Sequence, residues 1–140
     1  MIRLEQLIIC DDARPERHNK ISFMGVYFRD ILLRADKQWK EKGVIALPRL
    51  TFVVALSGVD GVTSCAWSLI NPDGTELVPP QDLEVGSDNQ EADKDSVSLM
   101  VISWRPAAFR QEGEYTFKLS FDEQSITHTF NIRVVEQLPA

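Results

Sequence analysis

Carboxylates, arginines and a histidine lie close together near the beginning of the chain, in the segment Asp11-Asp-Ala-Arg-Pro-Glu-Arg-His18. Two carboxylates beside a histidine could bind a metal ion or share a proton. The same side chains could instead form a solvated loop, in which an exposed Asp–Arg pair contributes about 0–1 kcal/mol, or they could contact a partner protein. The solvated loop is the simplest interpretation. The residues of this candidate functional loop are Asp11, Asp12, Arg14, Glu16 and His18.

Other chemical motifs are sparse. The acidic stretch 88–95 offers oxygen ligands that could suit calcium, but it lacks the glycine and the terminal glutamate of an EF-hand loop. His18 and His128 are the only histidines, which excludes a three-histidine zinc site. No glycine-rich phosphate or dinucleotide motif and no Gly-x-Ser-x-Gly motif occurs. We therefore expect a non-enzymatic protein with no catalytic residue, metal or cofactor.

Charge and composition restrict the partners. The formal net charge is −6, and the basic residues are scattered, so sequence-independent nucleic-acid binding is not expected. No stretch reaches the 18 or so apolar residues of a membrane span, and residues 1–10 do not resemble a signal peptide. We expect a cytoplasmic protein in which Cys10 and Cys65 are reduced, buried and apolar in character.

The alternation of apolar and polar residues predicts the fold. Residues 113–121 and 126–134 alternate with period two around a short polar turn, which indicates an antiparallel hairpin. A segment at 35–43 could hold one or two helical turns. The 140 residues fit one domain, 1–140. We predict an all-β, antiparallel, two-sheet sandwich of about eight strands. The strands outside the hairpin are expected at 3–11, 20–33 (two strands if bent near Gly25 or Asp30), 50–56, 63–70, 75–86 (short or at an edge) and 97–104.

The approach to the hairpin gives a more specific indication. Gln111-Glu-Gly-Glu-Tyr115-Thr-Phe117 resembles the entry into strand F of immunoglobulin-like domains, with Phe117 where antibody domains carry cysteine. The resemblance implies that the Tyr115 hydroxyl bonds to the backbone a few residues upstream. The sandwich is therefore expected to be immunoglobulin-like.

The opening of the chain resembles a family of short bacterial proteins of unknown function. The resemblance rests on Leu7-Ile-Ile-Cys-Asp-Asp-Ala-Arg-Pro-Glu16, on Asn19-Lys-Ile-Ser-Phe-Met-Gly-Val-Tyr27, on the Asn71-Pro-Asp-Gly74 turn and on the closing hairpin. It implies a single bacterial β domain. It implies no activity, cofactor or site residue.

Several expected strands are apolar on both faces, although a simple sandwich leaves its outer faces polar. One outer face is therefore expected to be covered, either by segment 35–43 with Trp39, or by a second copy of the chain, or by a different protein. The candidate partner-contact residues are Met24, Val26, Phe28, Val53, Met100 and Ile102.

These observations favour a binding or structural module that acts through protein–protein contact, with itself in a homodimer or with another protein. The alternative is a small-ligand or metal-dependent hydrolytic protein that uses Asp11, Asp12 and His18.

Overall fold

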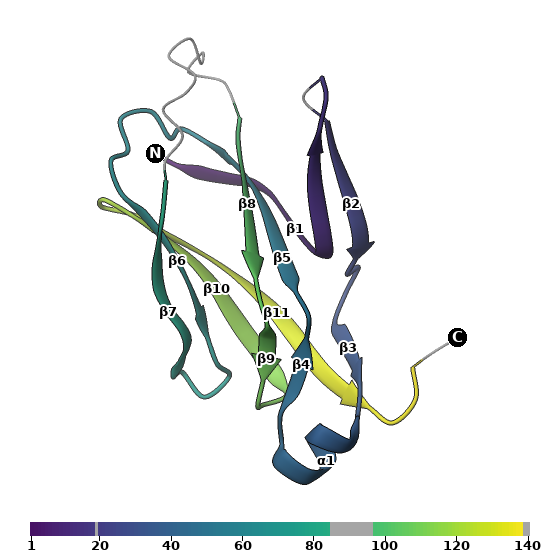
Figure 1. Cartoon of the computed structure of the whole chain (residues 1–140). Helices are drawn as coiled ribbons and strands as arrows, with labels where there is room; N and C mark the ends of the chain where they lie inside the picture. The colour runs from purple at the N-terminus through teal and green to yellow at the C-terminus, as the bar shows by residue number, and fades with distance from the viewer. Residues whose placement is uncertain (19, 85–96, 139–140) are drawn as a thin grey trace.

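The computed structural model describes residues 1–18, 20–84 and 97–138. The described part of the chain forms eleven strands and one short helix (Figure 1). The elements are β1 (Arg3–Glu16), β2 (Lys20–Val26), β3 (Ile31–Arg34), α1 (Lys37–Lys42), β4 (Ile45–Leu47), β5 (Leu50–Ser57), β6 (Cys65–Ile70), β7 (Glu76–Leu83), β8 (Ser98–Trp104), β9 (Ala107–Phe109), β10 (Gly113–Phe121) and β11 (Ser125–Val135).

The strands form three sheets within the described residues. The first sheet has the order β2-β1-β5-β8 and is antiparallel throughout. The second has the order β3-β11-β10-β6-β7, and its only parallel pair is β3 with β11. The third is the short antiparallel pair β4-β9.

The fold is therefore mostly β, as expected, but it is not a clean immunoglobulin-like sandwich. The prediction of two antiparallel sheets and about eight strands is wrong in three respects: the third sheet, the parallel pair and the number of strands. β4 and β9 are only three residues long, and β3 only four, so none of them contains enough alternation to be recognised by period.

The core lies between the first and second sheets. Phe52 on β5 stacks on Phe117 on β10, with ring centroids 4.6 Å apart. Tyr115 is fully buried and its hydroxyl donates to the carbonyl of Gln111 at 2.6 Å, which confirms the hydrogen bond expected from the sequence. Burial of a tyrosine is favourable when its hydroxyl finds such a partner.

Several local predictions are confirmed. β10 and β11 form the expected hairpin, in which Ser120 pairs with Ser125. The run 20–33 divides into β2 and β3, and the interrupted strand β7, with Pro79 and Pro80, lies at a sheet edge. At the predicted turn, the backbone N–H of Gly74 donates to the carbonyl of Asn71.

The predicted helical turns at 35–43 also exist. α1 begins after Asp36, whose carboxylate accepts from the backbone N–H of Trp39 at 2.8 Å. Trp39 packs on the main core, not on an outer sheet face. The prediction that segment 35–43 covers the outer sheet face is therefore wrong, because Trp39, its large apolar side chain, packs on the main core instead. No helix in the described segments is both long and apolar enough to cross a membrane.

Candidate functional site

The acidic segment near the beginning of the chain is a strand, not a loop. β1 continues to Glu16 and pairs with β2 as far as Glu16 with Lys20. Its ladder with β5 ends at Cys10 with Thr51, so residues 11–16 have a ladder neighbour on one side only. An edge position of this kind tolerates charged side chains and Pro15, whose missing N–H needs no partner there. The polar composition that predicts a loop is therefore also compatible with this strand extension.

Asp12 is held by two arginines. Its carboxylate lies 2.7 Å from the guanidinium of Arg49 and 3.2 Å from Nε of Arg14, and it accepts from the backbone N–H of Ala13. The hydrogen bonds from Arg14 and Arg49 hold the pKa of Asp12 below its usual value. Asp12 therefore ties the β1–β2 hairpin to the segment that precedes β5.

Asp11 has different partners. The hydroxyl of Tyr27 donates to Oδ1 of Asp11 at 2.6 Å. Burial, followed by the hydrogen bond to Asp11, raises the pKa of Tyr27 above its usual value. Asp11 thus fixes the end of β2 against β1.

The remaining members of the candidate functional loop, Glu16 and His18, are exposed at the tip of the hairpin. The structure brings Asp12 and Arg14 together, and it gives Asp11 a separate role. No group of three histidine, cysteine, aspartate or glutamate side chains suited to a metal ion occurs in segments 1–18, 20–84 and 97–138. The acidic stretch 88–95, considered for calcium, lies outside the described residues.

Both cysteines are buried and free, as expected. Burial, with a smaller contribution from Asp11 and Asp12, raises the pKa of the Cys10 thiol. Burial raises the pKa of Cys65 to about 11. A nucleophilic thiol requires a lowered pKa, so this arrangement corresponds to structural cysteines.

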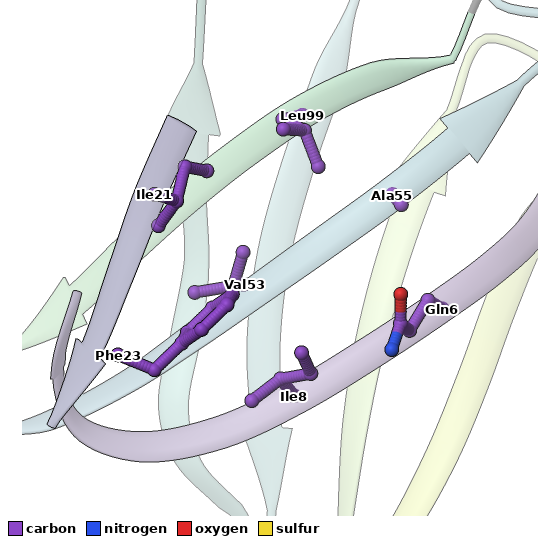
Figure 2. A pocket seen from close by; sticks show the side chains of 7 residues that line it. All are labelled: Gln6, Ile8, Ile21, Phe23, Val53, Ala55 and Leu99. Atoms are coloured by element: carbon purple, nitrogen blue, oxygen red, sulfur yellow. The ribbon is translucent and has the colours of Figure 1, made fainter. Parts of the chain in front are cut away.

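The outer side of the first sheet carries an apolar hollow of about 220 Å³ (Figure 2). Val53 and Ala55 on β5 are buried in its floor, although they face away from the main core. Ile21 and Phe23 of β2 partly cover this floor, and Val53, Cys10 and Ala13 form a separate small core with Ile8 and Ile21 around them. The residues that line the hollow are Gln6, Ile8, Ile21, Phe23, Val53, Ala55 and Leu99. We call them, together with Val101, which lies opposite Val53 in the ladder, the outer apolar face.

The outer apolar face remains partly open to solvent. Leu99 is 54% exposed, and Phe23 and Val101 are each 39% exposed. Phe23 belongs to edge strand β2, whereas Leu99 and Val101 belong to edge strand β8. Apolar side chains on the two edges therefore flank a buried apolar floor.

The six candidate partner-contact residues are distributed over different parts of the molecule. Val53 lies in the outer apolar face, whereas Met24 is exposed elsewhere on β2. Placing Met100 and Ile102 on the outer side is wrong, because Ile102 is 4% exposed in the main core and Met100 packs on that core. The alternation of 97–104 correctly separates two faces, but only the register with β5 shows that Leu99 and Val101 are the outer ones.

Val26 and Phe28 line a second hollow, of about 350 Å³, between β1 and β11. The position of His128 in phase with Ile126 and Phe130 predicts that it points at the core, but the structure shows it exposed in this hollow. We call this hollow the seam groove. Its lining residues are Leu7, Ile8, Ile9, Val26, Tyr27, Phe28, Arg29, Asp30, His128, Thr129, Phe130 and Asn131.

Residues 5–135 match the model of a family described as "Family of unknown function (DUF6941)". No curated protein matches the chain. The match confirms the expected family of unknown function, and the bacterial origin stays a prediction.

Proposed function

Since the chain belongs to the DUF6941 family, whose function is unknown, we propose from its surface that it is a non-enzymatic protein-binding module. The outer apolar face is its contact surface, and the partner is a second copy of the chain or another protein. One observation carries the proposal: a continuous apolar surface extends from Phe23 on one edge strand, over Val53, to Leu99 on the other.

The physical argument is the cost of leaving this surface in water. Burial of apolar area is favourable by about 25 cal/mol per Å². Isolated exposed apolar residues are common in proteins, but apolar residues that gather around a hollow are typical of contact surfaces. Among the described residues that line the hollow, only Gln6 is polar. The surface therefore suits an apolar partner and offers little to a charged ligand.

The contacts of the acidic segment of β1 favour a structural role for its carboxylates over a catalytic or metal-binding one. Asp11 and Asp12 each have protein partners, Tyr27 for the first and Arg14 and Arg49 for the second. These interactions position β2 and, with it, Ile21 and Phe23 at the outer apolar face. The charged residues thus support the proposed contact surface.

The test compares the wild-type chain with Leu99→Asp and with the control Thr116→Asp. Leu99 lies in the outer apolar face, whereas Thr116 lies on β10 in the second sheet. Both substitutions place an aspartate in a strand, so they share its unfavourable strand propensity. Circular dichroism first establishes that both variants fold.

Light scattering then gives the mass in solution over a range of concentrations, and affinity capture compares the three proteins as bait. We expect Leu99→Asp to lose self-association, or to lose specific captured proteins that Thr116→Asp retains. The proposal is wrong if the three proteins have the same mass and capture the same proteins.

A further inference from the structure

Two strand edges lack ladder partners along part of their length. β3 pairs with β11 only from Ile132 to Val135, so residues 125–131 of β11 have β10 on one side and no described strand on the other. β2 pairs with β1 only from Cys10 onward, so residues 3–8 of β1 are paired only with β5. Alternate backbone N–H and C=O groups on such an edge can bond to an additional strand.

These two open edges face one another across the seam groove. Leu7, Ile8 and Ile9 line it from β1, and residues 128–131 line it from β11. β1 and β11 form no ladder with one another. The seam groove is therefore a gap between the first and second sheets, at the side of the molecule where β2 continues into β3 (Figure 1).

Both ends of the gap are closed. At one end, the side-chain amide of Gln124 accepts from the backbone N–H of Ile2 at 3.1 Å and donates to its carbonyl at 2.7 Å. The side chain thus satisfies a donor and an acceptor of the residue that precedes β1, as the backbone of a neighbouring strand would. At the other end, the N–H of Tyr27 donates to the carbonyl of Ile9, and residues 28–30 continue to β3.

The groove has an apolar floor and a polar rim. Phe130 and Ile9 belong to the main core, and Leu7 packs on that core. Phe28 is 89% exposed, with the guanidinium of Arg29 5.8 Å from its ring centroid. His128, Thr129 and Asn131 are exposed on β11. A bound chain would therefore find apolar contacts for its inward side chains and polar partners beside its backbone.

We propose that the seam groove binds an extended peptide segment of another protein by β-strand addition to residues 125–131. β3 already occupies this side of β11 at Ile132–Val135, so the added segment continues the row that β3 begins. Seven residues at about 3.3 Å each give a site of about 23 Å. Main-chain hydrogen bonds would supply affinity, and alternate apolar residues would supply selectivity.

The walls of the groove determine the kind of occupant. The edge of β11 lies beside β1 and the segment 26–30, which line the same groove. A groove of about 350 Å³ bounded by these walls favours a single extended segment, because the edge strand of a second folded copy would carry its own sheet with it. The seam groove shares only Ile8 with the outer apolar face, and the proposed peptide site does not depend on that face.

The first experiment selects binders from a phage-displayed library of eight-residue peptides on the immobilised full chain. A selected peptide is then synthesised, and its Kd is measured by calorimetry for the wild type, for His128→Asp and for Thr127→Asp. His128 lies in the groove, whereas its exposed neighbour Thr127 is not among the lining residues. We expect His128→Asp to weaken binding at least about tenfold, because a carboxylate on the groove rim loses part of its hydration beneath the bound peptide. Thr127→Asp should change the Kd by less than about twofold.

Amide hydrogen exchange gives the second readout. Strand addition predicts that the bound peptide protects alternate amides in 125–131, and that it does so equally in Leu99→Asp, which tests the outer apolar face separately. The proposal fails if no peptide is enriched, or if the enriched peptide binds His128→Asp as tightly as the wild type. It also fails if these amides are protected by raising the protein concentration without peptide, which would indicate self-association.

Discussion

Asp11 and Asp12 are adjacent in the sequence, yet their carboxylates bind different partners. Asp11 accepts from Tyr27, and Asp12 binds Arg14 and Arg49. Neighbouring side chains on a strand point to opposite faces, so a pair of acids in a strand does not form the shared-proton pair that a loop could form. At the scale of single residues, the chemistry suggested by the sequence depends on the secondary structure that carries it.

Gly25 is the residue on which the Asp11 contact depends most directly. Its φ is +66°, and a Cβ added there would lie 2.8 Å from Cγ of Asp11 and would overlap its Oδ2. We expect Gly25→Ala to destabilise the protein by more than about 2 kcal/mol, through backbone strain and displacement of Asp11 from Tyr27. Chemical denaturation measures the change.

Gly61→Ala is the matched control. Gly61 has a φ of +77°, but an added Cβ meets no atom within 4 Å. Gly61→Ala should therefore lower the free energy of unfolding by only about 1 kcal/mol, from backbone strain. Equal effects of the two substitutions would contradict a specific role for the contact between Gly25 and Asp11.

The hydrogen bonds of Asp122 predict that the stability of the protein depends on pH. Hydrogen bonds from Ser64 and Thr63 lower its pKa to about 2, from the usual value of 3.8. Because the folded pKa lies below the unfolded one, the unfolded state binds more protons between these values. The contribution of Asp122 is therefore complete above about pH 4 and is lost as the pH falls toward 2.

Urea unfolding of the wild type and Asp122→Asn between pH 7 and pH 2 tests this expectation. The wild type should be more stable at neutral pH, and the difference should shrink with acidification through the window from about 4 to 2. Glu123→Gln changes an adjacent exposed charge that makes no hydrogen bond to Thr63 or Ser64 among those described, so it should follow the wild type. A difference between wild type and Asp122→Asn that does not vary with pH would contradict the role of ionised Asp122.

At the scale of elements, β5 has two buried faces because different parts of the chain cover them. Val54 faces the main core, whereas Val53 lies in the outer apolar face beneath the β1–β2 hairpin. The sequence predicts that β5 is apolar on both faces and that something covers the outer one. The sequence does not show that β2 is the cover. β1 continues beyond the end of its ladder with β5, and β2 reaches the outer face only because it pairs with this continuation.

Val53→Ala and Val54→Ala form a matched pair that tests the covered outer side. Val53 is 3% exposed and Val54 is fully buried. Each substitution removes two buried methyl groups, so each should cost about 2 kcal/mol, including part of a cavity term. Equilibrium denaturation gives both values. If Val53→Ala costs less than about 0.5 kcal/mol, the outer side of β5 is not covered in solution.

At the scale of the whole molecule, one main hydrophobic cluster joins all three sheets. It contains Ile45 from β4, Phe52 from β5, Phe109 from β9 and Phe117 from β10. Core residues that are shared in this way lose their contacts together when any one sheet separates. The arrangement therefore predicts a single cooperative unit.

Two optical signals test this cooperativity. The three tryptophans Trp39, Trp67 and Trp104 all contact the main cluster, so their fluorescence reports on packing, whereas far-ultraviolet circular dichroism reports on the strands. We expect the two urea transitions to coincide within error. Separate midpoints would show that a part of the molecule, such as the β1–β2 hairpin, unfolds independently.

The sequence by itself determines the features that arise between near neighbours in the chain. Period-two alternation indicates most of the longer strands and the closing hairpin, and Pro72 and Gly74 indicate the Asn71–Gly74 turn. The resemblance of residues 111–117 to the entry into an immunoglobulin-like strand F implies the hydrogen bond of Tyr115 to the backbone upstream. Each depends on residues within a few positions of one another, so local backbone preferences are sufficient to specify it.

Only the tertiary structure decides which strands are neighbours and which apolar faces are covered. Leu99 and Ile102 both belong to one apolar run, and the ladder of β8 with β5 assigns the first to the outside and the second to the core. The open edges of β1 and β11, and the seam groove between them, likewise depend on where β2 and β3 end their pairing. Val53 and Val101, which pair in the ladder of β5 with β8, lie 48 positions apart, and Ile31 and Ile132, which pair in the ladder of β3 with β11, lie 101 positions apart. Alternation within a strand contains no information about a partner at such a distance.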